Sequence, residues 1–178
     1  FLKYGSIGSL GLLPSISCNY FGEQERSIER DFFEIDKILS QPVMDLSVLK
    51  EPIIIASLEL KRYKNNFICE VSSTSGAHGI SVGNSDKLKS VWPVFYTRLQ
   101  PYLIGKDVRD LEAIMEGIYL YKSNYKLQNL ALWVPWATIE FALLDMIGKI
   151  QNQSIGQLLG EVHHPKISVY QANNFRGK

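Results

Sequence analysis

The stretch IEFALLDMIGKIQNQSIGQLLG, residues 139–160, sets two carboxylates, Glu140 and Asp145, among apolar side chains. Apolar residues recur there at helical spacing, and a second apolar face holds Phe141 and Leu144. The spacing predicts a helix over 135–151, with Pro135 in its first turn and most of its circumference buried between layers. The residues of the main apolar face are Ile139, Ala142, Leu143, Met146 and Ile150.

The two carboxylates of this helix are five positions apart, which puts them about 140° apart around a helix axis. They therefore do not form an acid–base pair. Asp145 can meet Lys149 at the i, i+4 spacing, whereas Glu140 requires a buried donor from elsewhere in the fold. The geometry favours a structural role for both residues.

Upstream of this helix, three β-rich segments predict an antiparallel meander over residues 53–60, 67–73 and 79–83. The turn from Ser75 to Gly79 joins the second and third strands, and its glycines provide positive φ angles. Helices are predicted over 86–99, ended by Pro101, and over 107–122, capped by Asp107. In the first helix, the residues expected to face the core are Leu88, Val91, Trp92, Phe95 and Leu99. In the second helix, they are Leu111, Ile114, Met115, Ile118 and Tyr121. The fold class is therefore α+β, a three-stranded meander followed by a helical bundle.

In a meander, the first turn and the end of the third strand lie at the same edge of the sheet. The two segments predicted to share a surface are Arg62, Tyr63, Lys64 and Asn66, and Asn84, Ser85 and Asp86. His78 belongs to the opposite edge, so it is interpreted as a solvated turn residue rather than a base.

The composition and charge of the chain limit the classes of partner that it can bind. The 178 residues are 46% hydrophobic and carry 19 basic and 18 acidic side chains, which excludes the electrostatic footprint of a nucleic-acid or anionic-membrane binder. A small neutral or anionic ligand is the expected partner. Cys18 and Cys69 suit neither a disulfide framework nor a zinc site, and the adjacent His163 and His164 lack a nearby carboxylate to complete one.

The N-terminal residues 1–18 combine one lysine, a short apolar run and small residues, which is typical of an export leader with no stable membrane span. Phe1-Leu2-Lys3 resembles the part of a twin-arginine signal that follows its arginines, so a periplasmic location is expected, with the cytoplasm as the alternative. Ser15 disfavours lipidation of Cys18. Residues 19–52 are interpreted as an N-terminal extension, and the ends at Phe1 and Lys178 indicate a fragment.

Residues 139–160 resemble the signature of the mandelate racemase/muconate lactonizing enzyme family of the enolase superfamily: Ile-Glu-x-Ala-Leu-x-Asp, Gly-Lys and Leu-Leu-Gly. The turn Gly76–Gly79, PYLIGKD at 101–107 and VY at 169–170 follow the family order, so the resemblance covers about residues 53–178. The departures from the family pattern are Asn84, Pro135, Thr138 and Glu161.

The resemblance implies a capping domain at 53–162 and, at 163–178, the first strand of a truncated (β/α) barrel that ends at Asn173 and Asn174. It also implies that the catalytic lysine or histidine bases and three Mg²⁺-binding carboxylates lie beyond Lys178. No residue of this chain is therefore expected to be catalytic or to bind the metal.

The activity that the resemblance implies is removal of the proton α to a carboxylate, aided by Mg²⁺. The short first loop, Arg62 to Asn66, favours an acid-sugar dehydratase, with Arg62 or Lys64 contacting a carboxylate or hydroxyl. Ordinary solvated charge is the competing interpretation for both. The alternatives are a racemase, epimerase or cycloisomerase, or an exported carbohydrate-binding relative without catalysis, and the full-length protein is expected to be a homo-oligomer.

Overall fold

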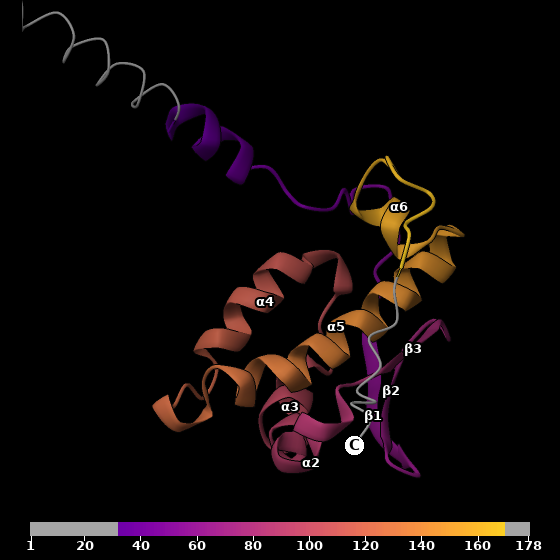
Figure 1. Ribbon diagram of the computed structural model, residues 1–178. Helices are drawn as coiled ribbons and strands as arrows, with labels where there is room; N and C mark the ends of the chain where they lie inside the picture. Colours follow the sequence, from indigo (N-terminus) through magenta and orange to yellow (C-terminus); the bar gives the residue numbers. More distant parts are fainter. Residues whose placement is uncertain (1–31, 170–178) are drawn as a thin grey trace, which may run out of the picture. The chain divides into compact units, whose positions relative to one another are not determined.

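The computed structural model describes residues 32–169 (Figure 1). The chain divides into two compact units, 1–42 and 43–178. In the first unit the described part, residues 32–42, contains an exposed helix over 32–39. The predicted leader at 1–18, including Cys18, and the predicted strand end at Asn173 and Asn174 lie outside the described residues. All of the structure that follows belongs to the second unit.

The sheet has three antiparallel strands in the order β1-β2-β3, which confirms the predicted meander. They are β1 (Ile55–Tyr63), β2 (Asn66–Ser73) and β3 (His78–Val82). The inner face carries Leu58, Cys69 and Val71, which are buried. Burial raises the pKa of the Cys69 thiol to about 12, so it behaves as an inert core residue.

A nearly continuous helical stretch follows the sheet: α2 (Ser85–Val94), the π-helical turn η1 (Phe95–Leu99) and α3 (Gln100–Leu103). The predicted stop at Pro101 is wrong, because the chain stays helical to Leu103. Pro101 stands in the first turn of α3, where a missing N–H costs little. The predicted core stripe is also wrong at Trp92, whose side chain is 45% exposed.

The next helix begins with the 3₁₀ turn η2 (Val108–Asp110) and continues as α4 (Leu111–Leu120). Asp107 caps η2 by accepting from Arg109 N, and its Oδ1 also accepts from Ile53 N at 3.1 Å. The cap therefore ties the start of the sheet to the helices. Leu111, Ile114 and Ile118 are buried as predicted, but the predicted stripe is wrong at Met115, whose side chain is 42% exposed.

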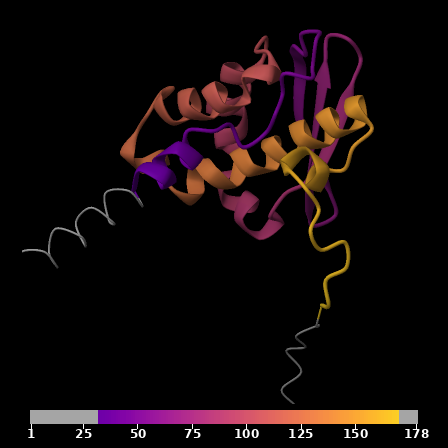
Figure 2. The same ribbon diagram turned by 90° about the horizontal axis from the view of Figure 1, so that it is seen from above.

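The longest helix, α5 (Leu130–Gln151), follows the 3₁₀ turn η3 (Tyr125–Leu127), and α6 (Ile155–Leu159) comes last. The predicted start of this helix at Pro135 is wrong, because it begins five residues earlier and Pro135 lies inside it. Figure 2 shows α5 against one face of the sheet. Gly79 and Gly83 of the β3 segment allow this approach, since a Cβ on either residue would overlap atoms of α5.

Among the described residues, α5 is the one helix long and apolar enough to cross a membrane, yet 56% of its most apolar window is buried inside the structure. Ile139, Ala142, Leu143 and Met146, all in the predicted apolar face, are fully buried. These observations favour a core helix. Residues 166–169 carry no strand, and the described residues contain no barrel neighbour for them, so the first barrel strand stays a prediction.

Candidate functional site

The two segments predicted to share a surface meet at one end of the sheet. Phe67 N donates to Ser85 Oγ at 3.1 Å, and Ser85 Oγ lies 3.4 Å from Asn66 Oδ1. Gly83 N donates to Phe67 O at 2.9 Å, which continues the β2–β3 pairing up to the loop. The structure thus brings the first turn and the segment after β3 together, as the meander topology requires.

The first loop is shorter than predicted, because Arg62 and Tyr63 end β1 and Asn66 begins β2. The connection is the two-residue turn Lys64-Asn65, in which Lys64 has a φ of +54°. The Arg62 guanidinium lies 5.9 Å from the centre of the Phe67 ring, and its Nε donates to Lys64 O at 3.3 Å. A tight turn therefore holds the exposed cations of Arg62 and Lys64 at the tip of the hairpin.

Asn84 has a structural role at this surface. Its Oδ1 accepts from Lys87 N at 3.2 Å, so it is the N-cap of α2. Asp86 lies in the first turn of the same helix and pairs with Lys89 at 3.1 Å on an exposed face. Of the second segment, Ser85 is therefore the residue that hydrogen-bonds to the start of β2, directly after the turn.

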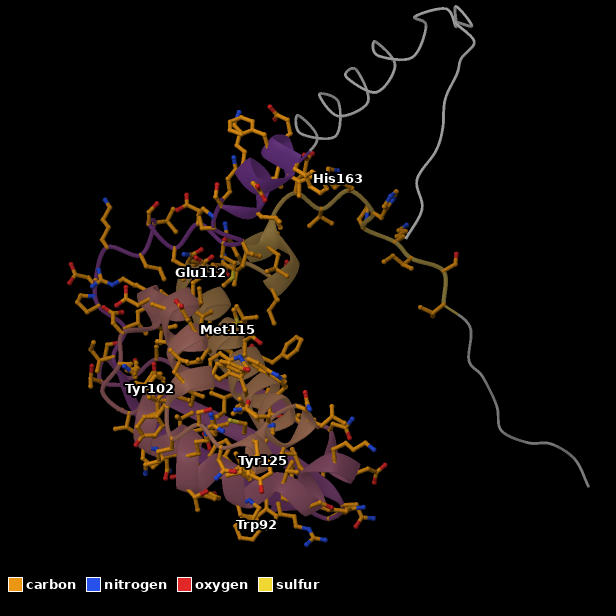
Figure 3. The ribbon with its side chains drawn as sticks, turned by 90° about the vertical axis from the view of Figure 1, so that its left-hand side faces the viewer. Trp92, Tyr102, Glu112, Met115, Tyr125 and His163 are labelled. Atoms are coloured by element: carbon orange, nitrogen blue, oxygen red, sulfur yellow. The ribbon has the colours of Figure 1, made fainter. Side chains whose placement is uncertain are left out.

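Two helical residues that the sequence analysis did not identify, Tyr96 and Gln100, bind the free edge of β1. Tyr96 Oη lies 3.1 Å from both Leu60 N and Leu60 O, and Gln100 Nε2 donates to Leu58 O at 2.7 Å. Trp92 packs edge-on against Tyr96, with ring centres 6.3 Å apart. In Figure 3, Trp92 lies at the end of this unit far from Glu112. The spacing of Trp92, Tyr96 and Gln100 places them on one helical face but does not indicate that this face meets β1.

His78 stands at the other end of the sheet, where it is exposed and opposite Ser72. This placement confirms that it cannot join Arg62 or Lys64. A cavity of about 610 Å³ lies at this other end, lined by residues 48–53, Ser75 and the end of α5. The predicted specificity surface and this cavity are therefore separate places.

The carboxylates of α5 have different surroundings. Asp145 Oδ2 lies 2.7 Å from Lys149 Nζ and accepts from Ile80 N at 2.8 Å, which confirms the predicted ion pair. Burial acts to raise the pKa of Asp145, but these partners outweigh it and the pKa is lowered. Burial raises the pKa of Glu140, for which the described residues provide no donor. The donor predicted for Glu140 is thus not among them.

The lowered pKa of Asp145 predicts how the stability of the protein depends on pH. Because the folded-state pKa of Asp145 is lowered, its stabilising contribution is present above its ordinary value of 3.8 and is lost as the pH falls through the folded-state pKa. We expect Asp145→Asn to destabilise the protein at pH 6, and the difference from the wild type to shrink as the pH falls below 3.8. Urea unfolding across this range measures the effect. Asp86→Asn, at an exposed ion pair, is the control and should change little; equal effects of both variants would contradict the prediction.

In the part of the chain that the structure describes, no group of three His, Cys, Asp or Glu residues could hold a metal ion. His163 and His164 are exposed. The described residues therefore provide no set of ligands for Mg²⁺.

The sequence profile described as mandelate racemase / muconate lactonizing enzyme, N-terminal domain, matches residues 39–160. A D-galactonate dehydratase family member from Marinomonas sp. (strain MWYL1) is 29% identical over 108 residues, which are 60% of this chain and 26% of that protein.

Two crystal structures share the fold. One, described as a racemase from Roseobacter denitrificans, is 18% identical, with a TM-score of 0.51 over 59% of this chain and 28% of that chain. The other, a muconate cycloisomerase from Azorhizobium caulinodans, is 19% identical, with a TM-score of 0.51 over 64% of this chain and 32% of that chain. The chain thus spans about a quarter to a third of the length of these relatives.

Proposed function

Because the chain belongs to the mandelate racemase / muconate lactonizing enzyme family through its N-terminal domain, we propose that it caps the active site of an enzyme that removes the proton α to a carboxylate. The favoured activity is dehydration of an acid sugar. Loss of the α-proton and of the β-hydroxyl group, as water, would give an enol that tautomerises to a 2-keto-3-deoxy acid. The bases and metal ligands would lie in the part of the protein beyond this chain.

The observation that carries the proposal is the two-residue turn Lys64-Asn65 beside Ser85. Such a short first loop leaves room for a hydrophilic, extended substrate, whereas a long flap would cover it. Arg62 and Lys64 place two cations on this tip, where they would attract a carboxylate and donate hydrogen bonds to hydroxyl groups. In a capped active site, these side chains would select substrate and exclude water.

Mg²⁺ bound by the rest of the protein would stabilise the enediolate charge that develops on the substrate. The D-galactonate dehydratase family relative, 29% identical over 108 residues, supports the acid-sugar class. The proposal extends to export to the periplasm and to a homo-oligomeric full-length protein. Export is tested by fractionating cells that make the protein with and without residues 1–18.

The test is a screen of the full-length protein against acid sugars, with Mg²⁺ and with a chelator, following 2-keto-3-deoxy acid formation. We expect turnover that the chelator abolishes. Arg62→Ala should lower kcat/KM about tenfold through the loss of about 1.4 kcal/mol of binding. Lys61→Ala is the matched control, because Lys61 pairs with Glu59 and Glu70 on the outer face of the sheet.

Each alternative activity has its own outcome in the screen. Incorporation of solvent deuterium at the α-carbon without loss of water would indicate a racemase or epimerase instead. Binding of acid sugars with neither exchange nor dehydration would indicate a non-catalytic carbohydrate-binding relative. Equal losses in Arg62→Ala and Lys61→Ala would contradict the role given to the hairpin tip.

A further inference from the structure

The three-stranded sheet has two outer edges, β1 and β3, and side chains of the helices bind the β1 edge. Tyr96 Oη hydrogen-bonds to Leu60, and Gln100 Nε2 donates to Leu58 O. The beginning of β1 is paired with residues 105–107, which precede η2. The backbone groups along β1 are therefore largely occupied, and this edge offers little to another strand.

The opposite edge of the sheet is formed by β3, and no strand pairs with it among the described residues. On its inner side, Ala77 O accepts from Ser73 N at 2.8 Å and Gly83 N donates to Phe67 O at 2.9 Å. Residues bonded to the neighbouring strand alternate with residues that face away from it in an antiparallel pair. The residues whose N–H and C=O groups point away from β2, called the β3 edge, are therefore His78, Ile80 and Val82.

The β3 edge carries exposed apolar side chains. Ile80 and Val82 are 46% and 69% exposed, and both lie on the outer face of the sheet. An edge strand with apolar side chains and outward backbone groups is a template on which a strand of another molecule can pair. Proteins usually block such an edge with a charge, a proline or a covering element.

A charged pair of α5 occupies the middle of the β3 edge. Asp145 Oδ2 accepts from Ile80 N at 2.8 Å and lies 2.7 Å from Lys149 Nζ. The side chains of Asp145 and Lys149 are 33% and 49% exposed, so both charges remain in contact with water. The central N–H of the edge is thus already bonded, and a strand that approached it would have to displace Asp145 or bury an ion pair, which is costly.

We propose that Asp145 and Lys149 block the β3 edge and so prevent the sheet from pairing, edge to edge, with the sheet of a second copy of this protein. Two β3 strands related by a twofold axis would pair Ile80 with Ile80 and His78 with Val82. This pairing requires the N–H of Ile80, which is the group that Asp145 holds. The inference concerns the sheet alone and does not rest on the proposed function.

The test measures the mass of the full-length protein by size-exclusion chromatography with light scattering, well below its melting temperature. Asp145→Ala removes both the acceptor for Ile80 N and the ion pair. We therefore expect assemblies larger than those of the wild type, in a share that rises with protein concentration. Glu59→Ala is the matched control, because Glu59 also pairs with a lysine, Lys61, but lies on β1, whose edge is already bound; it should keep the wild-type mass.

A second substitution separates loss of the blocking charge from loss of stability. Val82→Lys adds a charge to the β3 edge without restoring the bond to Asp145. The double variant Asp145→Ala/Val82→Lys should keep the lowered melting temperature of Asp145→Ala but return to the wild-type mass. Association of the double variant to the same extent as Asp145→Ala would indicate partial unfolding instead and would overturn the proposal. So would a wild-type mass for Asp145→Ala at every concentration.

Hydrogen exchange in the wild-type full-length protein needs no variant, so it tests the proposal even if Asp145→Ala does not fold. The N–H of Ile80, bonded to Asp145, should exchange slowly, whereas the outward N–H groups of His78 and Val82 should exchange many-fold faster. Equal protection of all three N–H groups would mean that another strand already pairs with the β3 edge, and the blocking role of Asp145 would then be wrong.

Discussion

Replacement of Arg98 by methionine is expected to lower the free energy of unfolding by about 3–5 kcal/mol. Arg98 is 2% exposed, and its guanidinium makes four hydrogen bonds, all of them to backbone carbonyls. Nε donates to Tyr121 O at 2.8 Å and Nη1 to Leu127 O at 2.9 Å. Nη2 donates to Ile118 O at 3.0 Å and to Tyr119 O at 3.2 Å.

The size of this loss in the free energy of unfolding follows from the backbone carbonyls that lose their hydrogen-bond donors when Arg98 is replaced. The last turn of a helix has unsatisfied C=O groups and a partial negative charge, and Arg98 supplies donors and a positive charge to the end of α4. Burial lowers the pKa of Arg98, but an arginine stays protonated. Methionine fills much of the same volume without a donor, so several buried carbonyls would lose their partners at once.

Urea unfolding at pH 7 measures the effect of Arg98→Met. Arg98→Lys keeps the charge but not the planar fork that reaches several carbonyls, so it should recover only part of the loss. Arg62→Met, at an exposed arginine, is the control and should change the free energy of unfolding by less than about 0.5 kcal/mol. A loss below about 1 kcal/mol for Arg98→Met would contradict the role of Arg98.

The meander was predictable because each strand alternates between an inner and an outer face. Leu58, Cys69 and Val71 show the period-2 pattern that selects the buried face. The role of Arg98 was not predictable in this way. An arginine on an apolar helix suggests a solvated charge, and the carbonyls that bind it come from residues 118–127, more than 20 positions away for the most part.

The two helix boundaries predicted from prolines were wrong, and each has a physical reason. Pro101 and Pro135 predicted a stop and a start, yet the chain is helical on both sides of each. The π-helical turn η1 shifts the hydrogen-bond pattern just before Pro101. The helix around Pro135 is buried against the sheet and α2, and this packing offsets one missing backbone hydrogen bond. Tertiary contacts of this kind leave no local signal.

At the candidate site, the sequence predicted which segments meet but not what each side chain does. Topology alone places the first turn beside the segment after β3, and Ser85 bonds to Phe67 N as a result. The capping role of Asn84 follows from its position before a helix and was available from the sequence. The contacts of Tyr96 and Gln100 with β1 depend on how the helices cross the sheet edge, which no spacing rule gives.

Replacement of Gly79 by alanine is the second large effect, with an expected loss of about 3 kcal/mol or more in the free energy of unfolding. A Cβ at Gly79 would lie 2.0 Å from Ala142 O and 2.6 Å from Met146 N. Both are backbone atoms of α5, so neither can move aside as a flexible side chain would. Either β3 or α5 must shift, and the Ile80 N–Asp145 bond at 2.8 Å would be disturbed with it.

The control is Gly156→Ala in α6, where the nearest atoms to a new Cβ are 3.9 Å away. That change should be neutral or stabilise the protein by up to about 1 kcal/mol, because alanine is the better helix former. The sequence suggested that the turn glycines supply positive φ angles, which holds for Gly76 at φ +87°. Gly79 lies in β3 without a positive φ. A glycine is required there because the sheet approaches α5 too closely for a Cβ atom. Wild-type stability of Gly79→Ala would show that the sheet and α5 have room to separate.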